Sequence, residues 1–68
     1  MNNKQEKPEC KLIGENGNIF NLLAITCKTL RNHGLDDEAE ELTSRIWGGD
    51  ANSYYQALQI IQEYVDVI

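Results

Sequence analysis

The sequence predicts a mainly helical fold: a compact three-helix domain preceded by one short N-terminal strand or extended arm. Three segments repeat apolar residues at helical spacing. Residues suited to helix caps precede these segments, and glycines follow the first two. The chain has 68 residues, which is enough for one domain only.

The N-terminal residues differ from the rest of the chain because they contain almost no apolar side chains that could be buried in a core. Residues 1–9 are polar and are predicted to form a disordered tail, so that residues 10–68 make a single helical domain. The short apolar run Cys10–Ile13 is a brief strand or an extended arm lying on the helices. Its pairing with the C-terminal residues 65–68 is one alternative.

The first helix is expected over residues 19–33. The Asn-Gly turn within residues 14–18 comes before it, and Asn18 suits the N-cap because its side-chain oxygen can accept from a free backbone N–H. Gly34 suits the position after the helix, where a left-handed conformation costs glycine nothing.

The second helix is expected over residues 37–47, with Asp36 as its cap and Gly48-Gly49 as its end. An acidic cluster crowds its N-terminal half, where the helix dipole favours negative charge; it comprises Asp36, Asp37, Glu38, Glu40 and Glu41.

The third helix is expected over residues 54–65. Ser53 and Gln56 form a capping box of the S-x-x-Q type at its start. Its end, residues 65–68, either frays or continues as an extended segment.

Composition and charge argue against several function classes. A net charge of −5 disfavours nucleic-acid binding, which relies on clustered Lys and Arg. Two cysteines outside a CxxC arrangement and a single histidine do not indicate a metal, and no cofactor motif is present. With no signal-like N-terminus and no long apolar run, we expect a cytoplasmic protein that does not enter a membrane.

No catalytic constellation is recognisable. Cys27 and His33 are the only thiol–imidazole pair of catalytic types. They lie six residues apart in one predicted helix and therefore on different sides of it. The carboxylates of the second helix are explained by its dipole, so we expect the chain not to be an enzyme.

Apolar residues that the predicted core does not absorb suggest a contact patch for a second copy or for a protein partner. Trp and Tyr are among the residue types that most often anchor interfaces. The bland alternative is that the tryptophan caps the core and the others are ordinary exposed apolar residues. The predicted patch comprises Ile25, Trp47, Tyr55, Ile60, Tyr64 and Val67.

An alternative function is an oligomeric sponge that sequesters an anionic nucleotide signal between subunits. Trp47 or Tyr55 would stack on the base. The basic contacts to the anion would come from Lys11, Lys28, Arg31 and Arg45.

The run Ile13-Gly14-Glu15-Asn16-Gly17-Asn18-Ile19-Phe20-Asn21-Leu22 resembles a group of short uncharacterised proteins of Firmicute bacteria, their phages and mobile elements. Similar features continue through residues 31–34, 38–41, 53–58 and 61–65, although the 48–52 loop is longer than expected for the group. The resemblance implies no catalytic residue. It does imply a phage-like context, in which small acidic proteins act by stoichiometric binding, for example as inhibitors of a host defence factor.

Overall fold

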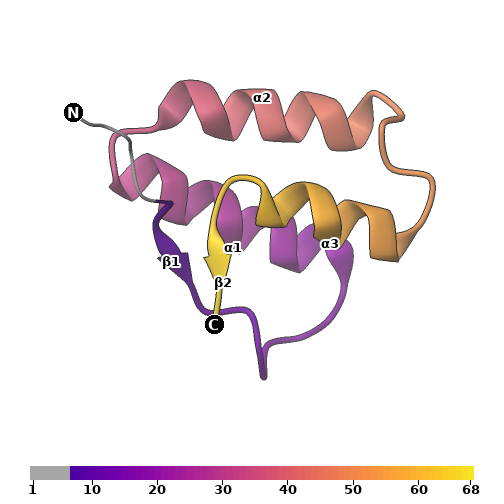
Figure 1. Ribbon diagram of the computed structural model, residues 1–68, viewed down its shortest axis with the longest axis horizontal. Coiled ribbons are helices and arrows are strands. Elements are labelled where there is room, and N and C mark those ends of the chain that lie inside the picture. Colours follow the sequence, from indigo (N-terminus) through magenta and orange to yellow (C-terminus); the bar gives the residue numbers. More distant parts are fainter. Residues whose placement is uncertain (1–6) are drawn as a thin grey trace.

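The computed structural model describes residues 7–68 and confirms the mainly helical, three-helix fold (Figure 1). Figure 1 shows α1 and α2 as a helical hairpin, with α3 running back beside them and the two strands together at one side. In chain order the elements are β1 (Glu9–Cys10), α1 (Ile19–Asn32), α2 (Asp36–Trp47), α3 (Tyr54–Gln62) and β2 (Asp66–Val67). Within the described residues, none of the helices has the length and apolar character needed to cross a membrane.

The ends of α1 follow the local rules read from the sequence. The side chain of Asn18 accepts a hydrogen bond from the backbone N–H of Phe20 at 2.8 Å, as expected for an N-cap. At the other end Gly34 has a φ of 76°, and the N–H of Leu35 donates to the carbonyl of Leu30 at 2.8 Å. This is a Schellman ending, and it requires the left-handed residue that glycine supplies.

The predicted cap of α2 was wrong by one residue. Leu35 occupies the N-cap position and no side chain caps the helix, whereas Asp36 lies inside the first turn. The Schellman ending of α1 delivers the chain directly into α2, so the helix begins before Asp36 can act as a cap. Asp36, Asp37 and Glu38 still occupy the first turn, where the helix dipole favours them.

The third helix is shorter than predicted. The oxygen of Ser53 accepts from the N–H of Gln56 at 3.2 Å, which confirms the cap, while the side chain of Gln56 accepts from the N–H of Asn52 at 2.7 Å. The helix ends at Gln62 instead of Val65. Beyond it the chain turns and becomes extended, because its last residues pair with the N-terminal arm.

That pairing is a two-stranded parallel sheet in which Glu9 faces Asp66 and Cys10 faces Val67. The N–H of Asp66 donates to the carbonyl of Pro8 at 2.9 Å, and the N–H of Ile68 donates to the carbonyl of Cys10 at 2.9 Å. The strand alternative is therefore the correct one, shifted to residues 9–10. The boundary of the predicted tail shifts as well, since Pro8 is buried and Glu9 is paired; residues 1–6 of that tail lie outside the described residues.

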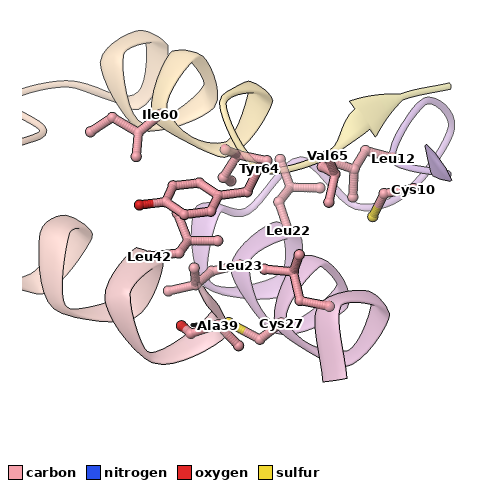
Figure 2. Close-up of a cluster of buried hydrophobic side chains, with 12 residues drawn as sticks. Cys10, Leu12, Leu22, Leu23, Cys27, Ala39, Leu42, Ile60, Tyr64 and Val65 are labelled. Atoms are coloured by element: carbon pink, nitrogen blue, oxygen red, sulfur yellow. Dashed lines mark hydrogen bonds between the residues drawn. The ribbon is translucent and has the colours of Figure 1, made fainter. Parts of the chain in front are cut away.

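The core lies between the three helices and the strand pair. Figure 2 shows Leu22 and Leu23 of α1 facing Leu42 of α2, with the ring of Tyr64 packed above them. Cys10 and Leu12 of the arm complete it beside Val65. The fully buried side chains of greatest volume are Leu30, Leu42, Ile61, Val65, Thr26 and Cys10.

Polar atoms inside this core have local partners. The hydroxyl of Thr26, which is fully buried, donates to the carbonyl of Leu22 at 2.8 Å. The thiol of Cys27 lies 3.3 Å from the hydroxyl of Thr43, and Cys10 accepts from the hydroxyl of Thr29 at 3.4 Å. Both cysteines are free and buried.

Candidate binding surface

Two of the residues predicted to form a contact patch are core residues. Ile60 is 6% exposed and Tyr64 is 7% exposed, so neither forms a surface patch and the prediction was wrong for both. Tyr64 lies beyond the end of α3, where the turn folds its ring over α2. Ile60 belongs to the buried face of α3 together with Ala57 and Ile61.

The other four predicted patch residues divide into two pairs. Ile25 and Val67 are half-buried and pack against the core. Trp47 and Tyr55 are exposed, as the prediction requires. The two exposed residues lie in different elements, Trp47 at the end of α2 and Tyr55 in the first turn of α3. The structure therefore leaves Trp47 and Tyr55 exposed but does not place all six residues in one patch, and the contact role of these two stays a prediction.

A different apolar surface surrounds Trp47, which is 59% exposed. The ring of Phe20, 57% exposed, stacks on the indole with 5.1 Å between centroids and 19° between planes. Beside this pair lies a hollow of about 280 Å³ that includes Tyr54, itself 47% exposed. We call this region the apolar end surface, and define it as Phe20, Trp47, Tyr54 and the hollow's other apolar residues Ile19, Ile46, Ala51 and Ala57.

Three helix ends build the apolar end surface. The hairpin brings the start of α1 against the end of α2 (Figure 1), where Phe20 stacks on Trp47. The start of α3 lies beside both, because Tyr54 shares the hollow with Ile19 and Ile46. The hydroxyl of Tyr54 approaches the turn before α1 at Gly17, where an added Cβ would lie 3.3 Å from it. The absence of a side chain at Gly17 therefore leaves room for the hydroxyl of Tyr54.

The patch predicted from the sequence does not include Phe20 or Tyr54 and so missed this surface. Both residues follow the helical rhythm, but they lie in the first turns of α1 and α3. At these first turns the neighbouring helices cover the side chains only in part, so both remain exposed to solvent. Their positions could have predicted this exposure, because Phe20 and Tyr54 lie at the starts of predicted helices and Trp47 lies at the end of one.

Arg45 is held within the protein by neighbouring side chains. Its guanidinium donates to Glu63 at 2.8 Å and to Asp50 at 3.3 Å, and to the hydroxyl of Tyr64 at 3.2 Å. That hydroxyl in turn donates to Glu41 at 2.8 Å. Contrary to the prediction of an anion contact, Arg45 joins α2 to the end of α3, and its charge is already balanced by carboxylates.

The pKa values of this cluster follow from these contacts. The hydrogen bonds to Glu63 and Tyr64 raise the pKa of Arg45 above its ordinary value. The hydrogen bond from Arg45 lowers the pKa of Glu63. Burial raises the pKa of Tyr64, with a further increase from its hydrogen bond to Glu41 that the Arg45 contact opposes. The cluster is a structural ion-pair network, in which the tyrosine stays neutral at physiological pH.

Arg31 does not reach the stacked aromatic rings of Phe20 and Trp47 within one chain. Lys11, Lys28 and Arg31 are exposed. Arg31 lies in the last turn of α1, whereas Trp47 stacks on Phe20 at the start of the same helix. Eleven residues of helix separate Phe20 from Arg31 by about 16 Å along the axis. One nucleotide bound to a single chain would therefore not reach both the Trp47 ring and Arg31.

The pair considered for thiol chemistry is separated by burial. Cys27 is buried against Thr43 and the carbonyl of Ala39, whereas His33 is exposed at the end of α1. Over residues 7–68, His, Cys, Asp and Glu side chains form no group of three that could hold a metal ion.

Comparison of the chain with known proteins finds no matching family model, curated protein or solved structure. The resemblance to short Firmicute and phage proteins stays a prediction. What the chain does must therefore be inferred from its own residues and surfaces.

Proposed function

We propose that this chain is a non-enzymatic binding protein that acts by stoichiometric protein–protein contact through its apolar end surface. One observation carries the proposal: the stacked rings of Phe20 and Trp47, both more than half exposed, adjoin an apolar hollow that the half-exposed ring of Tyr54 lines. Contiguous apolar surface of this kind on a small domain marks an interaction site more often than scattered single residues do.

The residue types of the surface fit this role. Tryptophan and tyrosine are enriched among interface residues that lose the most binding energy on truncation. Phe20 and Trp47 already stack on each other, so their rings lose less freedom on binding than two independent side chains would. A partner that covers them gains apolar burial at a small entropic cost.

The narrower form of the proposal, inhibition of a host defence factor in the cytoplasm of a host cell, is supported by the resemblance to phage-encoded proteins. An inhibitor that blocks its target by binding it one to one needs a contact surface but no catalytic residues. The structure offers a candidate surface at the apolar end.

The proposal is tested by cross-linking in the cells in which the chain naturally occurs. We expect the wild-type chain to be captured in a complex of defined mass, either with itself or with another protein. The double variant Phe20→Ser, Trp47→Ser should lose the complex because both stacked rings are removed. Ile13→Ser is the matched control, since it removes an exposed apolar side chain outside the surface. Equal capture of all three chains would contradict the proposal.

A further inference from the structure

We infer that the apolar end surface is a self-complementary interface through which two copies of this chain pair end to end. The inference rests on the proposed function and names the partner at that surface. A two-fold interface uses the same patch on both subunits, so one patch must supply both the projecting and the receiving parts. The apolar end surface contains both.

The projecting part is the stacked pair Phe20 and Trp47, and the receiving part is the hollow beside it. The two adjoin along the chain, because Phe20 follows Ile19 and Trp47 follows Ile46, and both isoleucines line the hollow. The volume of the hollow is about 280 Å³. It is enough for an aromatic ring, since an apolar cavity of about 150 Å³ accommodates benzene.

The exposed area is adequate for the centre of a dimer interface. Large aromatic side chains present about 200 Å² each, and Phe20, Trp47 and Tyr54 are each about half exposed, which leaves about 300 Å² of aromatic surface per copy. A stable interface covers about 800 Å² per partner and consists of an apolar centre with a polar rim. Asn52 and Ser53, which also line the hollow, supply polar groups at that rim.

Among the ways in which two acidic chains could pair, charge repulsion between them is smallest when they meet at the apolar end. The acidic first turn of α2 lies at the opposite end of that helix from Trp47, about 15 Å away along the axis. Asp50, in the loop after α2, is paired with Arg45 at 3.3 Å. Docking through the apolar end therefore joins two chains of net charge −5 while their acidic turns point to the two far ends. The apolar residues of this surface carry no charge that would select an oppositely charged partner instead.

The purified chain of 68 residues provides the test, by sedimentation velocity over a wide range of concentration. We expect a monomer–dimer equilibrium. Trp47 is the only tryptophan, so its fluorescence emission should shift to shorter wavelength as the dimer forms and covers the indole. Phe20→Ser keeps this fluorophore and should weaken dimerisation by about thirtyfold or more, as expected for loss of a central aromatic contact. Ile13→Ser should leave the dimerisation constant unchanged, and circular dichroism establishes that both variants fold.

A monomer at every concentration, with unshifted tryptophan emission, would overturn the inference. If the cellular complex still depended on Phe20 and Trp47 in that case, the proposed function would stand with a different protein as the partner. If that complex were also missing, both proposals would fall. A dimer that survives Phe20→Ser and dissociates with Ile13→Ser would place the interface elsewhere and would likewise overturn the inference.

Discussion

Tyr64 combines a buried ring with a hydroxyl that has a partner on each side. The hydroxyl donates to Glu41 at 2.8 Å and accepts from Arg45 at 3.2 Å, while the guanidinium carbon of Arg45 lies 5.8 Å from the centre of the ring. The apolar part of the side chain packs in the core and its polar end reaches the surface network. This one residue therefore connects core packing with the ion pairs between α2 and the turn after α3.

Removing only the hydroxyl tests the value of these hydrogen bonds. We expect Tyr64→Phe to lower the free energy of unfolding by about 1 kcal/mol, since the ring stays packed and one set of hydrogen bonds is lost. Tyr64→Leu should cost more, because it also leaves part of the space unfilled. Urea denaturation of the three chains measures both values. An unchanged stability in Tyr64→Phe would mean that water replaces the hydroxyl at no cost.

Glu63 predicts how stability depends on acid. The hydrogen bond from Arg45 lowers the pKa of Glu63 in the folded state, so the folded protein binds a proton there less readily than the unfolded chain does. The stabilising contribution is therefore complete above the ordinary glutamate pKa of about 4.3 and is lost as pH falls through the lowered pKa.

We expect wild type to be more stable than Glu63→Gln at neutral pH, and the difference to disappear on acidification. Both side chains are exposed enough for salt to screen the pair, so added salt should also reduce the difference. Thermal unfolding against pH and salt measures it. A difference that persists unchanged at pH values well below the lowered pKa of Glu63 would show that charge on Glu63 is not its origin.

Among the elements, those set by local chemistry could be predicted from the sequence and those set by distant partners could not. Asn18 and Ser53 cap their helices through contacts two or three residues away, so residue type and spacing were sufficient. The end of α3 depends on the pairing of Asp66 with the arm near Glu9, 57 positions earlier in the chain. A helical pattern that continues to Val65 contains no information about that partner.

The end of α1 provides a test at this scale. Gly34 has a φ of 76°, and open space surrounds the position of an added Cβ, so substitution costs backbone strain alone. We expect Gly34→Ala to lower the free energy of unfolding by about 1–2 kcal/mol. Gly34→Asn should cost less, because asparagine tolerates the left-handed region. Equal losses in the two variants, measured by thermal unfolding, would mean that conformation at this position is not the cause.

At the scale of the whole molecule, the sequence could not assign exposed and buried sides to residues at the ends of elements. Which flank of α3 is covered depends on where α2 and the arm lie, so Ile60 and Tyr64 were placed outside although they are inside. Phe20 was left out of the predicted patch although it is 57% exposed, because α1 extends past the part of the bundle that could cover it. The apolar end surface forms where the starts of α1 and α3 meet the end of α2. The apolar pattern of one helix contains no information about where the other two begin or end.

The N-terminal arm is a structural part of the domain. Leu12 is 6% exposed in the common core and Cys10 is 1% exposed, whereas the neighbouring Ile13 is 69% exposed. The N–H of Leu12 also donates to the carbonyl of Ile68 at 2.9 Å, so the arm holds the last residues of the chain against the domain. Loss of the Leu12 side chain should therefore weaken the whole fold and not the arm alone.

We expect Leu12→Ala to lower the free energy of unfolding by about 2–5 kcal/mol, the usual cost of a large cavity-forming substitution in a core. Ile13→Ala, one residue further along, should change it by less than about 0.5 kcal/mol. Helical circular dichroism during urea unfolding is the decisive measurement, because the arm itself contains no helix. A domain of this size has little stability to spare, so the helices of Leu12→Ala should unfold at much lower urea. If their midpoint equalled that of wild type, the arm would be an appendage that the helical bundle does not need.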